Sequence, residues 1–263
     1  MNNTTAVFRK LHEDASGPLR LANVWDVASA RLVESLGAKA VATTSAGVAW
    51  ALGYPDGNKL PVKQLENLIL NILRIVHIPL SVDVEAGYTD DPKKVGENLK
   101  SILDSGIAGI NIEDGTDRAE VLAAKIENVR KISASLGVDV FVNARTDVFL
   151  QALVPEAQRV KETLKRAENY RSAGADGLFV PALADPRQIA EVVPAVPMPV
   201  NLMAWPGLPN AEALKKLGVR RLSSGSGIPQ IIWNHTARVA KDFLETGASK
   251  PMSQDYMAYA DLQ

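Results

Sequence analysis

The chain has 263 residues, a net charge of −1, no cysteine and 5% aromatic residues. This balance argues against nucleic-acid binding, because neutralising phosphates requires an excess of Lys and Arg. The absence of cysteine excludes disulfides, thiolate nucleophiles and Cys-ligated metals. No apolar run reaches the roughly 18 residues of a membrane span, and the polar N-terminus does not look like a signal peptide. We therefore expect no membrane contact and a cytoplasmic location.

Short apolar segments alternate with longer amphipathic segments along the chain. The predicted strands cover residues 19–26, 39–46, 80–85, 109–113, 138–145, 177–181, 199–204 and 219–224. The predicted helices cover residues 27–36, 62–77, 118–136, 155–173, 211–217 and 228–246, with two more that begin at Asp91 and Asp185. Eight strand–helix units favour parallel pairing and closure into an α/β fold, the (β/α)₈ TIM barrel.

A doubly wound open sheet is the alternative fold. It would normally carry a Gly-rich turn after the first strand, where this chain reads Asn-Val-Trp-Asp over residues 23–26. The barrel is therefore preferred, and we expect it to span residues 17–247. Residues 1–16 are then an N-terminal extension, and residues 248–263 form a C-terminal tail.

Carboxylates follow two neighbouring predicted strands, where barrels build their active sites. Asp83 and Glu85 are two residues apart and point to one face of their strand, and Glu113 ends the next strand. Such acids repel one another unless a cation or a basic group lies between them. Oxygen ligands alone suit Mg²⁺ or Mn²⁺. The alternative is that these acids cap helices or pair with Arg145.

Other strand ends carry residues that could bind a small acid. Arg145 could hold a substrate carboxylate in a bidentate fork, or simply neutralise Glu113 or Asp147. The small residues at 45–47 could let backbone N–H groups approach an anion. Asn201 belongs to the seventh predicted strand. None of the three histidines falls at a predicted strand end, which excludes a His-ligated zinc barrel.

These strand-end residues, in this order, resemble the isocitrate lyase / phosphoenolpyruvate mutase superfamily over about residues 8–246. The resemblance is carried by residues 23–30, 44–47, 52–56, 83–88, 112–114 and 143–147. It implies a TIM barrel whose last helix is exchanged between neighbouring subunits, which would give a homodimer or a homotetramer.

The resemblance also implies a ligand set. Mg²⁺, or Mn²⁺ in its place, would be held by Asp83 directly or through water, and Asp56, Glu85 and Glu113 would complete the shell. A 2-oxo acid substrate would be bound by Ser45, Ala46, Gly47 and Arg145. Arg145 and Asp56 are the candidate catalytic residues, and Asn201 is a further candidate for substrate binding. Relatives usually have Asp at the position of Glu85, so its longer side chain leaves direct contact with the ion open.

The loop after the fourth predicted strand departs from the superfamily. The cleaving lyases carry a cysteine there, whereas residues 115–120 read Gly-Thr-Asp-Arg-Ala-Glu and lead at once into a helix. We therefore expect a Mg²⁺-dependent lyase that acts on a small 2-oxo acid through an enolate, as in oxaloacetate decarboxylation. The alternatives are phosphoenolpyruvate mutase, carboxyphosphonoenolpyruvate phosphonomutase or phosphonopyruvate hydrolase activity, and a barrel that binds a small acid without catalysis.

Overall fold

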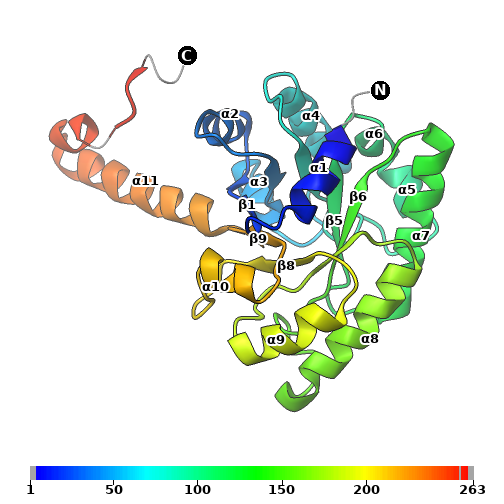
Figure 1. Ribbon diagram of the computed structural model, residues 1–263. Helices are drawn as coiled ribbons and strands as arrows, with labels where there is room; N and C mark the ends of the chain where they lie inside the picture. The colour runs from blue at the N-terminus through cyan, green and yellow to red at the C-terminus, as the bar shows by residue number, and fades with distance from the viewer. Residues whose placement is uncertain (1–3, 255, 260–263) are drawn as a thin grey trace. The chain divides into compact units, whose positions relative to one another are not determined.

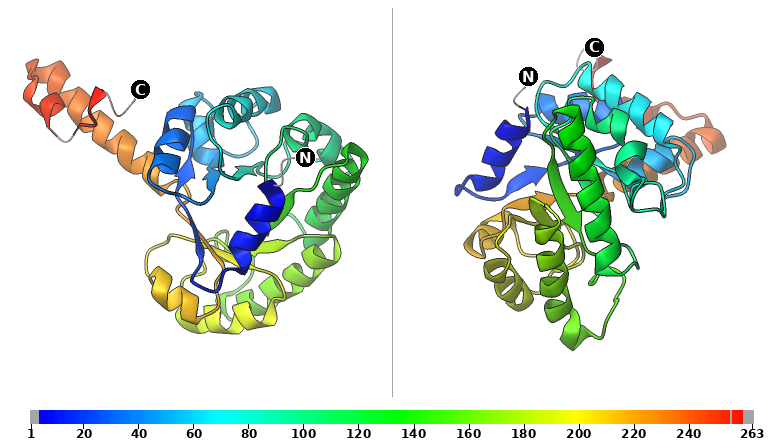
Figure 2. Two further views of the ribbon diagram at one scale, coloured as in Figure 1. Left: turned by 45° about the horizontal axis from the view of Figure 1, so that its top comes forward. Right: turned by 90° about the vertical axis from the view of Figure 1, so that its right-hand side faces the viewer.

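The computed structural model describes residues 4–254 and 256–259, and the chain divides into two compact units, Met1–Ser226 and Gly227–Gln263. In the first unit, one parallel sheet is surrounded by helices (Figures 1 and 2). The sheet order is β1-β9-β8-β7-β6-β5-β4-β3-β2. The predicted α/β barrel is therefore confirmed, and the domain limits at residues 16 and 247 stay predictions.

The first predicted strand is split in two and joins the edges of the sheet. β1 (Leu19–Leu21) pairs with β9, and β2 (Asn23–Val24) pairs with β3. Only Ala22 separates them, so one continuous segment bridges the two ends of the sheet order. The other strands are β3 (Val41–Thr43), β4 (Leu80–Asp83), β5 (Gly109–Glu113), β6 (Phe141–Arg145), β7 (Gly177–Phe179), β8 (Val200–Met203) and β9 (Arg221–Ser223).

The helices of the first unit follow the predicted alternation, with shorter bounds in several places. They are α1 (Thr4–Glu13), α2 (Val27–Ser35), α3 (Ser45–Ala51), α4 (Val62–Leu73), α5 (Val95–Asn98), α6 (Lys100–Leu103), α7 (Ala119–Leu136), η1 (Glu156–Gln158), α8 (Arg159–Ser172), α9 (Pro186–Ala195) and α10 (Ala211–Lys216).

Two sequence expectations about local structure are wrong. Asp91 does not cap the third helix, because its side chain accepts the N–H of Lys93 in a turn and α5 begins only at Val95. The second strand is expected to run to residue 46, but residues 45 and 46 begin α3 instead. By contrast, Asp185 caps α9 by accepting the Arg187 N–H, as expected.

Apolar side chains fill two separate layers of the barrel. Outward-facing strand residues such as Val82, Ile110 and Val142 pack against the surrounding helices. A smaller cluster fills the interior at the amino ends of the strands: Phe8, Leu19, Leu21, Ala40, Ala42, Ala108 and Phe141. Gly109 makes room for this cluster, since a Cβ there would lie 2.6 Å from the Phe141 carbonyl oxygen. The amino end is therefore closed, and space for a ligand remains at the carboxyl end.

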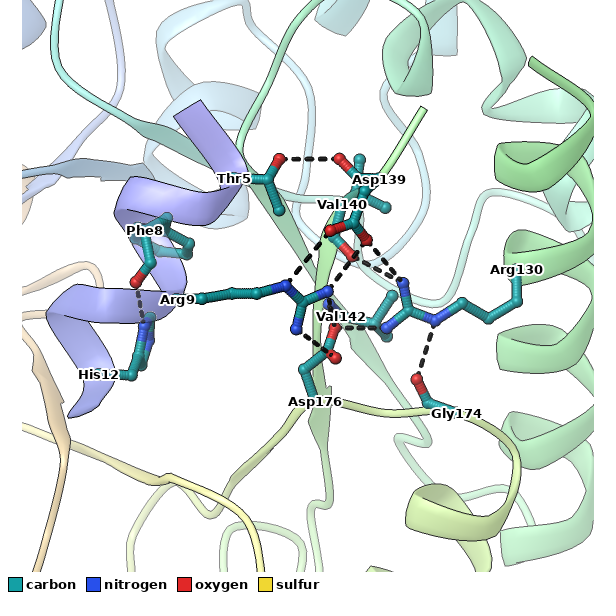
Figure 3. A network of polar contacts seen from close by, with 10 residues as sticks. All are labelled: Thr5, Phe8, Arg9, His12, Arg130, Asp139, Val140, Val142, Gly174 and Asp176. Atoms are coloured by element: carbon teal, nitrogen blue, oxygen red, sulfur yellow. Dashed lines mark hydrogen bonds and ion pairs between the residues drawn. The ribbon is translucent and has the colours of Figure 1, made fainter. Parts of the chain in front are cut away.

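The helix α1 closes the amino end of the barrel, although the sequence suggested a mere extension there. Phe8 of α1 is fully buried and makes an edge-on contact with the Phe141 ring. Arg9 binds Asp176 at 2.5 Å and Asp139 at 3.0 Å, and Arg130 of α7 contacts the same Asp176 carboxylate (Figure 3). These ion pairs fasten α1 to the loops that precede β6 and β7.

The second unit, within its described residues, consists of α11 (Gly227–Thr246) and η2 (Lys250–Ser253). Several large apolar side chains of α11 are exposed: Ile231 (68%), Ile232 (46%), Phe243 (46%) and Leu244 (83%). Among the helices within the described ranges, none combines the length and the apolar character that crossing a bilayer requires.

The buried His12 of α1 makes stability depend on pH. Burial lowers the pKa of His12 from 6.5 to about 3, and its ring stacks on Phe141. Between these values the unfolded chain binds a proton that the folded protein does not, so stability falls as the pH drops. We expect His12→Phe to remove roughly 1 kcal/mol of this loss per pH unit below about 6.

The measurement is the free energy of unfolding in urea, followed for both proteins between about pH 4 and pH 7. Comparing the pH dependence of the two free energies cancels the contribution of the carboxylates, because these titrate in both proteins. Parallel pH profiles would show that His12 is not the group responsible.

Candidate active site

A cavity of about 150 Å³ opens at the carboxyl ends of the strands, as the barrel fold predicts. Its polar lining comes from several strand ends and loops: Asn23, Thr44, Ser45, Asp56, Asp83, Asn111, Arg145, Ser223 and Ser226. The remaining lining residues are Ala46, Leu150, Phe179, Met203 and Gly225. Acidic and basic side chains thus meet inside a small space with apolar walls.

Two carboxylates, Asp56 and Asp83, share this cavity. Asp83 is 8% exposed, and its Oδ1 accepts the N–H of Glu85 at 3.0 Å. Burial raises the pKa of Asp83, and the negative charge of Asp56 adds to the rise while Arg145 opposes it. The site therefore holds negative charge that is incompletely balanced, which is the condition under which a divalent cation binds well.

Arg145 lines the cavity and is held on two sides. Its Nε and Nη2 donate to the two oxygens of Asp147 at 2.6 and 2.9 Å, and its Nη1 contacts Glu113 at 2.6 Å. Burial disfavours its charge, but Glu113 and Asp147 outweigh that cost and the pKa of Arg145 is raised. A guanidinium has five N–H groups, so these three contacts leave one on each terminal nitrogen for a ligand.

Behind Arg145, the buried Asp114 ties the ends of β5 and β6 together. Its Oδ1 accepts the Asp147 N–H at 2.8 Å. Its Oδ2 accepts Arg166 Nη1 at 2.7 Å and the Tyr170 hydroxyl at 2.5 Å, both from α8. This anchors the backbone of Asp147, which in turn orients Arg145.

Glu85 adopts a left-handed backbone conformation and contacts the neighbouring loop. Its φ is +50°, which is uncommon for a residue other than Gly, Asn or Asp. Its Oε2 accepts the N–H of Asn58, and the Asn58 side chain accepts the N–H groups of Ala86 and Tyr88. Because Asp56 lies two residues before Asn58, these contacts fix the loop that brings Asp56 to the cavity.

The structure brings together some of the predicted site residues and separates others. Ser45, Ala46, Asp56, Asp83 and Arg145 line one cavity. The cavity lining leaves out the other predicted residues, Gly47, Glu85, Glu113 and Asn201.

Those four are nevertheless buried or partly buried close to the site. Glu113 pairs with Arg145, so both interpretations of Arg145 offered by the sequence remain compatible with its position. Asn201 lies beneath the cavity, where its Oδ1 accepts the Ser223 hydroxyl at 3.4 Å. Among residues 4–254 and 256–259, no group of three or more acidic or His side chains is placed to hold a metal ion by direct contact. The full ligand set therefore stays a prediction.

Sequence reasoning missed several residues of the site. Asn23, Thr44, Asn111 and Ser223 line the cavity, and Asn58 positions its loop. Strand alternation could have indicated Asn111, which precedes Glu113 by two residues on the same face. The contacts of Asn58 join two loops that are 27 residues apart, and no local pattern announces them.

The chain matches the phosphoenolpyruvate phosphomutase family over residues 8–244. It therefore belongs to this family, which is part of the phosphoenolpyruvate mutase / isocitrate lyase superfamily of lyases and mutases. Members of the superfamily generally depend on Mg²⁺.

Individual relatives agree with this assignment. An uncharacterized protein of Mycobacterium tuberculosis is 36% identical over 97% of this chain and 94% of its own length. The oxaloacetate decarboxylase 1 of Pseudomonas fluorescens is 26% identical over 78% of this chain and 73% of its own. A crystal structure from Burkholderia cenocepacia J2315, of a candidate phosphonomutase, is 39% identical with a TM-score of 0.85, covering 91% of this chain and all of that one.

The hydroxyl of Tyr170 should contribute to stability because it binds a buried carboxylate. We expect Tyr170→Phe to lower the free energy of unfolding by about 1.5–3 kcal/mol, the range for hydrogen bonds to charged groups. Tyr54→Phe is the matched control, since the Tyr54 hydroxyl only accepts Gln64 Nε2 in a half-buried position. Urea unfolding of both variants makes the comparison. Equal losses of unfolding free energy in the two variants would mean that the hydrogen bond to Asp114 contributes no more to stability than the half-buried one of Tyr54.

Proposed function

We propose that this enzyme is a Mg²⁺-dependent lyase of small 2-oxo acids, with oxaloacetate decarboxylation as the leading reaction. The observation that carries the proposal is the meeting of Asp56, Asp83 and Arg145 in one small cavity at the carboxyl end of the barrel. Two acids beside a guanidinium can hold a cation and an organic anion next to each other.

The donor set fits Mg²⁺, with Mn²⁺ as a substitute. Mg²⁺ binds through one or two carboxylates and keeps several waters, so Asp83 and Asp56 are sufficient direct ligands. Glu85 is buried, and both the Asn58 N–H and Tyr88 hydrogen-bond its carboxylate, so it is held in place and would accept a metal-bound water. Glu113, which pairs with Arg145, would likewise contact the waters around the ion and not the ion itself. An ion bound here supplies positive charge beside the keto oxygen where an enolate develops.

The residues of the chain would bind the substrate and exclude water from the reacting carbons. The two N–H groups of Arg145 that face away from its acidic partners bind the substrate carboxylate, and Ser45 and Ala46 confine its position. Phe179 and Leu150 limit the water around the reacting carbons. In decarboxylation the bond from C3 to the departing carboxylate breaks, CO₂ leaves, and the electron pair enters the enolate of pyruvate. Solvent then protonates C3, so no acid from the chain is required.

A phosphonate reaction is the second candidate. It is favoured by the likeness to the Burkholderia cenocepacia candidate phosphonomutase. The chain between β5 and α7 opposes it, because only residues 114–118 separate these elements and a phosphoryl intermediate needs more complete shielding from water.

The test is pyruvate release from oxaloacetate with Mg²⁺ present. We expect EDTA to abolish it and Asp83→Ala to lower the rate about 100-fold, since this variant loses a ligand of the ion whose positive charge would lie next to the developing enolate. Asp104→Ala, an exposed carboxylate at the end of α6, is the matched control and should leave the rate unchanged. Turnover of phosphonopyruvate alone, followed by phosphorus NMR, would favour the second candidate, and an unchanged Asp83→Ala rate would refute the metal assignment.

We also propose that the chain forms a homodimer or homotetramer by exchange of α11. The exposed apolar side chains of this helix support a second copy as its partner. We expect Leu244→Glu to shift the sedimentation velocity of the protein toward a monomer, because it buries a charge in the interface. Lys241→Gln on the same helix changes the net charge by the same −1 at an exposed ion-paired position and should leave the assembly intact. A monomeric wild-type protein would contradict the proposal.

A further inference from the structure

A charged side chain lies inside the barrel beneath the cavity. Arg221 of β9 is 1% exposed and forms no ion pair within the described residues, although the negative charge of Asp83 acts on it. Burial lowers the pKa of Arg221 to about 9, so it remains a cation at neutral pH. Its guanidinium carbon lies 5.7 Å from the centre of the Phe8 ring, between the apolar cluster and the site. Burying a charge without an ion-pair partner costs free energy of folding, which suggests that Arg221 is retained for a function.

Arg221 hydrogen-bonds a residue that lines the cavity. Arg221 Nη2 donates to Asn111 Oδ1 at 3.1 Å, and Asn143 Nδ2 donates to the same oxygen at 2.9 Å. Two donors on one oxygen fix which end of the Asn111 amide is the carbonyl. The amide nitrogen must then face the other way.

The other end of this amide meets the candidate metal ligand. Asp83 and Asn111 are direct partners across β4 and β5, and the Asn111 side chain hydrogen-bonds the Asp83 carboxylate. Asn111 and Asn143 are in turn partners across β5 and β6. Asp83, Asn111 and Asn143 therefore form a row across the neighbouring strands β4, β5 and β6, and Arg221 of β9 reaches Asn111 from a non-neighbouring strand.

We propose that Arg221 is a positioning residue: by fixing the Asn111 amide from below, it aims the Asp83 carboxylate into the cavity and so sets the affinity for a divalent cation. This inference rests on the metal site of the proposed function and adds the device that orients its central ligand. In the described part of the chain, Nε and Nη1 of Arg221 have no hydrogen-bond partner, so Nη2 and Asn111 make the contact that links this guanidinium to the site.

The electrostatic effect of removing Arg221 on cation binding is opposite in sign to the effect of losing its positioning role, which makes the inference testable. Removing a cation from beneath a metal site would tighten binding of another cation. Losing the orientation of Asp83 would weaken it, because second-layer contacts typically govern metal affinity by 10- to 100-fold. The sign of the change therefore separates a positioning role from an electrostatic one.

The experiment is Mn²⁺ binding to the full chain, followed by electron paramagnetic resonance without any substrate. We expect Arg221→Met to weaken binding about tenfold, and Arg221→Lys, which keeps a donor and the charge, to restore part of it. In an Asn111→Ala background, Arg221→Met should cause no further weakening, because its effect passes through Asn111. Arg220→Met is the control, since this neighbouring side chain contacts the Asp14 carbonyl at the surface.

Thermal unfolding of each variant shows whether it is folded, and a merely structural role would lower the melting temperature without changing the affinity for Mn²⁺. If Arg221→Met does not fold, Arg221→Lys with and without Asn111→Ala provides the same comparison. Unchanged or tighter binding in Arg221→Met, or equal weakening in both backgrounds, would overturn the inference alone. Failure of the wild-type protein to bind Mn²⁺ would overturn the proposed metal site and the inference together.

Discussion

The concentration of buried negative charge at one end of the barrel is the constraint on which the site depends. Asp83, Glu113 and Asp147 approach one another because parallel strands deliver their carboxyl ends to the same rim. Like charges at such distances destabilise the fold unless cations balance them. Arg145 balances Glu113 and Asp147 through its two-sided contacts, which leaves Asp83 and Asp56 as the two cavity carboxylates without an ion pair among the described residues and as the pair that we propose for a cation.

The opposite end of the barrel gives this charge a rigid support. The helix α1 inserts Phe8 among the first residues of the strands, and its ion pairs to Asp139 and Asp176 keep it there. The interior thus changes from apolar packing at the bottom, through the polar row of Arg221, Asn111 and Asn143, to carboxylates at the top. Hydrogen bonds from Arg221 and Asn143 fix the Asn111 amide beneath the cavity, which is how a rigid support holds polar groups of a site in fixed directions.

Sequence reasoning located strand ends well and contacts between loops poorly. Asp83 and Arg145 were found because strand periodicity is local and the barrel fold says which end carries function. The roles of Glu85 and Glu113 were harder to assign, because each bonds a partner from another segment: the Asn58 backbone in one case and Arg145 in the other. Asp91 was misplaced because a turn uses the same side-chain-to-backbone bond as a helix cap.

The order of apolar and polar residues along the chain determined the alternation of strands and helices, the parallel sheet and the rim where acidic side chains collect. Those properties depend on periodicities of two and 3.6 residues, which any stretch of sequence displays by itself. Tertiary structure alone decided that α1 closes the barrel, that Arg145 serves two acids while facing the cavity, and that Arg221 reaches Asn111. Such contacts join residues as many as 167 positions apart, and only the closure of the sheet brings them within bonding distance.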